Sequence, residues 1–196
     1  MTRIGIFEGA FDPPHNGQIS AVRAFMEQMW LDFVYVIPTA IVGESVTDAY
    51  HRLRMCQLAF GDMDGVYVSD AALLCTQSRS TADVLRELQA EDRRLFLLLG
   101  TDRLLDLGED AQVSEIFSLS YPVYVRREQD ALLDQKIIRK IADYQNAYGK
   151  VTRRIVTEPQ EISSHAIREH CRRGESISAT VPAMVEKYIG DNHLYV

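Results

Sequence analysis

The chain has 196 residues, of which 46% are hydrophobic and 25% are charged. This length and composition predict one globular domain with a sizeable core, and they exclude a disordered chain. The net charge of −7 argues against general nucleic-acid binding, although a local basic cluster could still receive phosphates. Apolar runs are short and the sequence opens on a strand pattern, so we expect a cytoplasmic protein without a signal peptide or membrane span.

Three cysteines, Cys56, Cys75 and Cys171, are spread along the chain. Their odd number and wide spacing indicate reduced structural thiols and not a disulfide or zinc framework. We assign no metal-ligating side chain from the sequence.

The first predicted unit is a strand at residues 4–7, a sharp turn, and a helix at residues 17–29. Gly9 and the proline pair at 13–14 break the strand. The turn aims His15 at the start of the helix, where free N–H groups and the helix dipole favour an anion. The alternative is an ordinary turn with a polar loop histidine.

The sequence GAFDPPHNG at residues 9–17 resembles the nucleotidyltransferase superfamily signature G-x-F-D-P-x-H-x-G-H. Gln18 stands where that signature has its second histidine. Replacing a charged donor by a neutral amide would weaken phosphate binding by about 1 kcal/mol. The resemblance implies ATP contacts by Gly9, Phe11, His15 and Gln18 and an acceptor contact by Ala10.

A second strand is predicted at residues 33–37 and a second helix at 50–60, with a loop between them. The nicotinate mononucleotide branch of the superfamily usually carries a Pro-Pro-His-Lys element in this loop, and it is absent here. Arg52 and Arg54 could supply positive charge nearby, or they could form a solvated helix face.

A third strand is predicted at residues 66–69, and Ser80 to Asp83 form a capping box that opens the next helix. The family has Ser-Tyr-Thr at this helix start, where its backbone meets the pyridine nucleotide. This chain keeps only Thr81 of that element. Thr81 is therefore either an acceptor contact or part of a helix cap.

The apolar run at residues 95–99 predicts a central parallel strand. Gly100 and Asp102 follow it, at the sheet edge where ligands bind in open α/β folds. They resemble the family's G-x-D-x-L element, which contacts adenosine. The family's stacking tryptophan would fall at Asp110, whereas the only tryptophan of this chain is Trp30.

The next elements are a strand at residues 122–125, a helix at 132–148 with Gly149 as its C-cap, and a strand at 154–156. We expect the nearby basic side chains to face water; they are Arg126, Arg127, Lys136, Arg139 and Lys140.

A second anion site is predicted where Ser163 or Ser164 caps a helix that carries Arg168 one turn in. The stretch resembles the family's I-S-S-T-x-I-R element, which holds the ATP phosphates, with His165 in place of threonine. His165 is either a further phosphate donor or an exposed first-turn residue. The resemblance implies ATP contacts by Ile162, Ser163, Ser164 and Arg168.

The alternation of strands and amphipathic helices predicts an α/β fold: a Rossmann-like, doubly wound parallel sheet with helices on both faces. We expect a single nucleotidyltransferase domain over residues 1–196, with a C-terminal helical part at about 163–196. The two anion-binding turns would then meet at one sheet edge and hold a polyphosphate at both ends.

The resemblance implies attack of a mononucleotide phosphate on the α-phosphate of ATP, with Mg²⁺ as cofactor and pyrophosphate as leaving group. His15 and Arg168 would be the catalytic residues, and Ala10, Thr81 and Asp110 would face the acceptor. The first hypothesis is adenylyl transfer to nicotinate mononucleotide in NAD biosynthesis. The alternatives are another phosphorylated acceptor, such as phosphopantetheine, and a nucleotide-binding homologue with weak catalysis. A homo-oligomer is left open.

Overall fold

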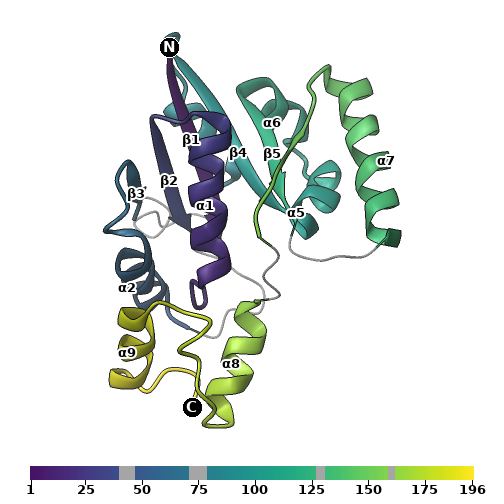
Figure 1. Ribbon diagram of the computed structural model, residues 1–196. Helices are drawn as coiled ribbons and strands as arrows, with labels where there is room; N and C mark the ends of the chain where they lie inside the picture. Colours follow the sequence, from purple (N-terminus) through teal and green to yellow (C-terminus); the bar gives the residue numbers. More distant parts are fainter. Residues whose placement is uncertain (40–46, 71–78, 127–130, 159–161) are drawn as a thin grey trace.

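The computed structural model describes residues 1–39, 47–70, 79–126, 131–158 and 162–196. Its centre is a six-stranded sheet in the order β3-β2-β1-β4-β5-β6, in which every neighbouring pair is parallel (Figure 1). The strands are β1 Thr2–Gly9, β2 Phe33–Pro38, β3 Val66–Val68, β4 Arg93–Gly100, β5 Ser120–Val125 and β6 Arg153–Ile155. This is the order expected of a doubly wound sheet that reverses beside β1.

Helices connect the strands. Before β4 come α1 Asn16–Met29, α2 Ala49–Phe60 and α4 Thr81–Leu88. After β4 come α5 Thr101–Asp106, a 3₁₀ turn Leu107–Glu109, α6 Val113–Leu119 and α7 Ala131–Tyr148. The chain finishes with α8 Ser164–Arg172 and α9 Ala183–Asp191. No helix among the described residues has both the length and the apolar character needed to cross a membrane.

Both faces of the sheet are buried. Along β4, Leu95, Leu97 and Leu99 pack into the core beneath α4 to α7, while Phe96 and Leu98 pack into the core beneath α1 and α2. Successive side chains of a strand point to opposite faces, so a continuous apolar run marks a strand that is covered on both sides. The α/β fold with helices on both faces is confirmed.

A third cluster joins the end of the chain to α2. Met55 of α2 packs against Ile167 of α8 and against Val185 and Ile189 of α9. Figure 1 shows α8 and α9 below the lower ends of the strands, beyond the start of α1. The C-terminal helices therefore lie at the carboxyl edge of the sheet; the assignment of residues 1–196 to one domain stays a prediction.

Two expectations about local structure were wrong or incomplete. Arg126 was expected to face water, but its side chain is buried and pairs with Asp134 of α7. Lys136 and Arg139 are exposed as expected, whereas Arg127 lies outside the described residues. The two short helices α5 and α6 were not predicted from the sequence, because six and seven residues are too few to show a helical period.

Two of the three cysteines lie in the described part of the chain. Cys56 is buried and Cys171 is half-buried, and both are unpaired. Burial raises the pKa of the Cys56 thiol well above its ordinary value. Cys75 lies outside the described residues.

Candidate active site

The turn after β1 places His15 directly before the first residue of α1. His15 is the N-cap of that helix, with φ −141° and ψ 166°, and its side chain is buried. The side-chain oxygen of Gln18 accepts a hydrogen bond from the backbone N–H of His15, over 3.1 Å. The oxygen of Gln18 is thus used inside the turn, and the other end of its amide is the donor Nε2.

Phe11 holds the middle of the turn through its ring. The backbone there has a φ of +50°, and the buried ring packs edge-on against Phe7 and Phe60, with centroid distances of 5.2 and 5.9 Å. A side chain packed in this way anchors the loop to the core. Any contact between Phe11 and a nucleotide would therefore come from its backbone.

The second predicted anion site lies directly against this turn. Ser163 is the N-cap of α8, and its hydroxyl accepts a hydrogen bond from the N–H of Ala166. Ser164 donates from Oγ to the carbonyl of Pro13 over 2.8 Å, and Arg168 donates from Nη1 to the carbonyl of Asp12 over 2.8 Å. Two segments about 150 residues apart in sequence are therefore joined by direct hydrogen bonds.

Arg168 is largely buried, and among the described residues its Nε has no hydrogen-bond partner. A buried guanidinium nitrogen that lacks a partner is costly unless a ligand meets it. Its neighbour His165 is exposed on the first turn of α8, as one of the two sequence interpretations held.

The C-terminal segment also holds the turn after β1 in place through hydrogen bonds. The sequence did not reveal these contacts. Tyr195 donates its hydroxyl to Oδ1 of Asp12 over 2.6 Å, and both side chains are buried. Burial and this hydrogen bond raise the pKa of Tyr195 far above its ordinary value, so the hydroxyl stays a donor at all working pH values. The N–H of Asn16 donates to the carbonyl of Thr180 over 2.9 Å.

A cavity of about 200 Å³ opens at the carboxyl ends of β1 and β4. Four residues predicted to contact ATP line it: Gly9, Gln18, Gly100 and Asp102. Ligands gather at this edge of a doubly wound sheet. The other six predicted ATP residues are outside the wall of this cavity and belong to the turn and helix start described above; they are Phe11, His15, Ile162, Ser163, Ser164 and Arg168.

A second cavity of about 250 Å³ adjoins the first. The two share four wall residues, Glu8, Gly9, Gly100 and Arg103. The second cavity adds Thr81, a predicted acceptor residue, which begins α4 behind its N-cap Ser80. The capping box expected at that helix start is present.

Ala10, the predicted acceptor residue in the turn after β1, is held by Arg52. Nη1 of Arg52 donates to the carbonyl of Ala10 over 2.8 Å, and Nε donates to the carbonyl of Thr47 over 3.2 Å. The Arg52 side chain is 1% exposed, so it neither lies on a solvated helix face nor reaches a ligand. Its role is to hold the turn against α2.

Asp110 is not among the wall residues of either cavity. Its Oδ2 accepts from Nη2 of Arg103 over 2.5 Å, and its Oδ1 accepts from the N–H of Gln112. Burial raises the pKa of Asp110, but these two hydrogen bonds outweigh burial and hold that pKa below its ordinary value. In the structure Asp110 orients Arg103, which is one of the four residues that both cavities share.

Glu8 is a site residue that the sequence interpretation missed. It lines both cavities, and burial raises the pKa of its carboxyl, while a hydrogen bond with Thr81 and the charge of Arg103 act in the opposite direction. The available signal was a lone charged residue at the end of an apolar strand, one position before Gly9.

Comparisons with known proteins identify the family of the chain. The family model described as Cytidylyltransferase-like matches residues 6–170. A probable nicotinate-nucleotide adenylyltransferase of Albidiferax ferrireducens is 31% identical over 200 residues, covering 100% of this chain and 98% of the relative. Another, of Gemmatimonas aurantiaca, is 29% identical over 198 residues, covering 98% of this chain and 92% of the relative.

A solved structure of Plasmodium falciparum nicotinic acid mononucleotide adenylyltransferase complexed with APC has a TM-score of 0.75 at 16% identity, covering 100% of this chain and 98% of that chain. The same enzyme complexed with NaAD has a TM-score of 0.74. At this identity the likeness shows a shared fold. With the family model and the full-length relatives, it shows that the chain belongs to the cytidylyltransferase-like family, in the group of the nicotinate-nucleotide adenylyltransferases.

Proposed function

We propose that the protein transfers the adenylyl group of ATP to nicotinate mononucleotide, forming deamido-NAD and pyrophosphate in NAD biosynthesis. The observation that carries this proposal is the direct joining of the two anion-binding turns. Ser164 and Arg168 donate to the carbonyls of Pro13 and Asp12, next to two adjoining cavities at the carboxyl edge. The names of the full-length relatives supply the acceptor.

ATP would take the first cavity. Asp102 lies in the first turn of α5 and is exposed, so its carboxylate would accept hydrogen bonds from the ribose hydroxyls. Gly100 would let the base approach the backbone. Gln18 would direct its free amide N–H₂ toward the phosphates, since its oxygen is occupied by the His15 N–H.

The acceptor would take the second cavity, between Thr81 and the shared Glu8–Arg103 wall. Its phosphate would meet the backbone N–H groups near Gly9 to Phe11. This places the acceptor phosphate beside the α-phosphate of ATP, because the two cavities share Gly9 and Gly100. Such alignment is the main requirement of an in-line displacement.

The displacement needs charge stabilisation and no side-chain nucleophile. An oxygen of the acceptor phosphate would form a bond to the α-phosphorus of ATP as the bond to the β-phosphate oxygen breaks. His15 would donate a hydrogen bond to the α-phosphate, aided by the positive end of α1. Arg168 would hold the β- and γ-phosphates with the nitrogens that the Asp12 carbonyl leaves free.

The magnesium ion would enter with ATP. Among the described residues, no group of three or more His, Cys, Asp or Glu side chains could hold a metal. Mg²⁺ commonly uses one or two carboxylates together with substrate phosphates. Glu158 is a carboxylate of the first cavity and fits that donor set, whereas the Asp102 carboxylate would be used by the ribose. Bound Mg²⁺ would neutralise phosphate charge in the transition state.

One observation favours a different phosphorylated acceptor as the second candidate. The wall of the second cavity, as far as the structure describes it, contains no aromatic side chain for a pyridine ring to stack on. Its polar groups are Glu8, Thr39, Thr81 and Arg103. An acceptor rich in hydrogen-bonding groups, such as phosphopantetheine, would use such a wall.

Pyrophosphate release from ATP and Mg²⁺ decides between these functions when each acceptor is offered separately. We expect release with nicotinate mononucleotide, and none from the His15→Ala variant. Release with phosphopantetheine alone would keep the chemistry and change the acceptor. No release with nicotinate mononucleotide, nicotinamide mononucleotide or phosphopantetheine, despite measurable ATP binding, would leave a nucleotide-binding protein without this catalysis.

A further inference from the structure

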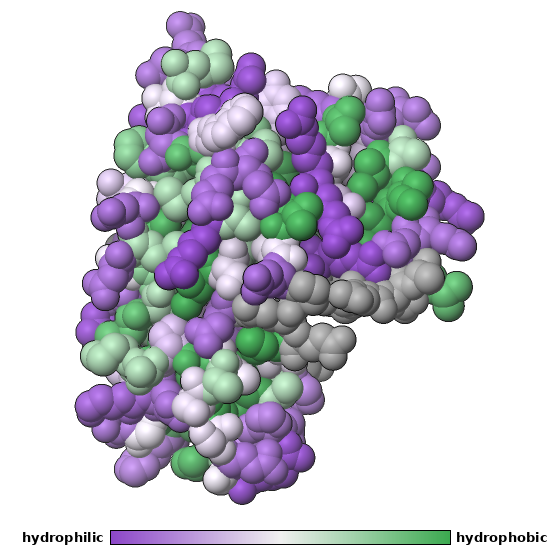
Figure 2. Space-filling model, in the orientation of Figure 1, coloured by the Kyte–Doolittle hydropathy of each residue, from purple (hydrophilic) through white to green (hydrophobic). Residues whose placement is uncertain are grey.

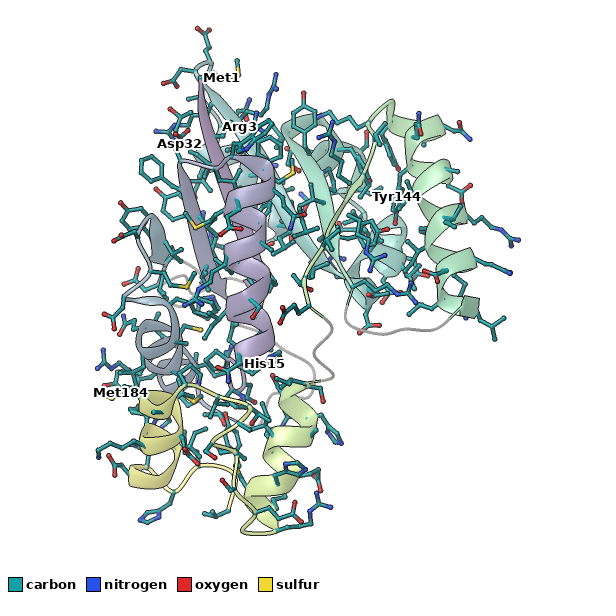
Figure 3. The ribbon with its side chains drawn as sticks, in the orientation of Figure 1. Met1, Arg3, His15, Asp32, Tyr144 and Met184 are labelled. Atoms are coloured by element: carbon teal, nitrogen blue, oxygen red, sulfur yellow. The ribbon has the colours of Figure 1, made fainter. Side chains whose placement is uncertain are left out.

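A larger cavity lies at the opposite end of the sheet from the candidate active site. Its volume is about 620 Å³, and it is formed by the amino ends of β1, β4, β5 and β6 together with the end of α1 and the segment after α7. Figure 3 shows the separation, with Arg3 near the upper end of the sheet and His15 at the lower end of α1. This amino-end cavity shares no wall residue with either active-site cavity.

The wall of the amino-end cavity is strongly basic. Arg3, Arg94, Lys150 and Arg153 line it, and no Asp or Glu is among its described wall residues. Within the described part of the chain, none of these four side chains forms an ion pair with a carboxylate. Asp32 lies close by, but its carboxylate accepts from the backbone N–H of Arg3 (Figure 3).

This concentration of positive charge stands out because the chain as a whole has a net charge of −7. Figure 2 shows hydrophilic side chains among paler ones over the upper part of the visible face. Two cations share one ring: Cζ of Arg94 lies 5.3 Å and Nζ of Lys150 lies 4.4 Å from the centroid of Tyr121. The two charges are therefore less than about 10 Å apart, a distance at which like charges still repel, and a bound anion would relieve that repulsion.

Lys150 is held in place without being neutralised. Its Nζ donates to the carbonyls of Ser118 and Ser120, over 3.1 and 2.9 Å. Burial lowers the pKa of the Lys150 ammonium, because the charged form is kept from water and has no anionic partner among the described residues. An anion in the cavity would restore that pKa.

Aromatic surfaces lie between the cations. Trp30 is 79% exposed at the end of α1, and Tyr121 is 37% exposed on β5. Phe96 lies beneath Arg3, whose Cζ is 4.6 Å from the ring centroid. Exposed aromatic rings interleaved with Arg and Lys are typical of surfaces that stack nucleobases and bind phosphates.

We propose that the amino-end cavity binds a free nucleotide, with the base stacked on Trp30 and two or more phosphates held by Arg94, Lys150 and Arg153. The volume lies within the range of small-molecule sites. A long nucleic acid is disfavoured because the rest of the chain is acidic. The site goes beyond the proposed adenylyl transfer and does not depend on it.

The chain supplies its own probe for this site. Trp30 is the only tryptophan of the protein and it lines the cavity, so its emission reports binding there. We expect ATP, and likewise a dinucleotide, to quench this emission with saturation, while adenosine and inorganic pyrophosphate bind at least tenfold more weakly. Pyrophosphate binding as tightly as ATP, or a single-stranded RNA oligonucleotide binding more tightly than either nucleotide, would overturn the proposal.

A double variant, Arg94→Gln with Arg153→Gln, tests the phosphate contacts. Both arginines are exposed, and the variant's unfolding curve checks that it folds. We expect its Kd for ATP, read from Trp30, to rise at least tenfold, and equilibrium dialysis to find one ATP per chain fewer than in the parent protein. Arg23→Gln is the matched control, since Arg23 is exposed on α1 outside the cavity. An unchanged Kd and an unchanged number of bound ATP in the double variant would overturn the proposal, whether or not the protein turns over.

Discussion

Removing the hydroxyl of Tyr195 tests whether the end of the chain holds the phosphate-binding turn. In Tyr195→Phe the buried side chain of Asp12 loses a donor that lies 2.6 Å from its Oδ1. The ring remains, so the change removes the hydrogen bond with little change in packing. A hydrogen bond to a charged group contributes about 1.5–3 kcal/mol, and we expect the free energy of unfolding to fall by about 2 kcal/mol. For a chain of this size, that corresponds to a drop in Tm of about 4–8 °C.

The same variant should lower turnover by about tenfold, because Asp12 also accepts from Arg168 through its carbonyl, and a shifted turn misaligns the phosphates. Urea unfolding followed by circular dichroism measures the stability, and pyrophosphate release measures the turnover. Tyr188→Phe is the matched control: its hydroxyl lies 2.9 Å from Nδ1 of His51 in a part-buried setting, and it should lose less than about 1 kcal/mol. Equal effects of the two variants on stability and turnover would refute the role assigned to Tyr195.

Four further variants test separate parts of the site. His15→Ala should abolish turnover and leave ATP binding measurable, and a variant as active as the parent protein would exclude the proposed role. Gln18→His should raise turnover by about tenfold, since a charged donor would face the phosphates; an unchanged rate would favour a protein that only binds nucleotides. Ser80→Ala should reduce the free energy of unfolding by about 1 kcal/mol through loss of the N-cap of α4. A reduction below about 0.3 kcal/mol, measured by urea unfolding, would show that this cap does not stabilise the protein. Glu8→Gln should stabilise the protein at pH 8 and have little effect at pH 4. The pKa of Glu8 is raised in the native state, so native stability falls as the pH rises from the ordinary value of 4.5 through the native pKa, and glutamine removes this loss. Equal urea midpoints for the parent protein and the variant at pH 8 would contradict this.

The fold and the positions of the two helix starts, at His15 and Ser163, could be predicted because their signals are local. A buried strand such as residues 95–99 shows an uninterrupted apolar run, and a helix start such as Ser163 shows its cap. The apolar spacing from Ile19 to Met29 placed the start of α1 near Gly17, one residue from the observed start at Asn16. These features depend on neighbouring residues, so one sequence is enough to find them.

Other parts of the site depend on contacts that the sequence does not encode locally. Arg52 follows the spacing of an exposed helix face, yet it is buried because the carbonyl of Ala10, 42 residues away, meets it there. Tyr195 reaches Asp12 across 183 residues. The resemblance assigned Asp110 to the acceptor site through the position of the family's tryptophan, and it gave no sign of the ion pair that Asp110 forms with Arg103. Long-range polar pairs of this kind need the folded structure.

The most direct test of adenylyl transfer by this chain follows the α-phosphate of ATP. ATP labelled at that phosphate is incubated with Mg²⁺, nicotinate mononucleotide and the protein, and the products are separated by chromatography. We predict that the label appears in deamido-NAD, in equal amount to the pyrophosphate released, and that His15→Ala forms none. Label that remains in ATP, or that appears as AMP without the dinucleotide, would contradict the proposed function.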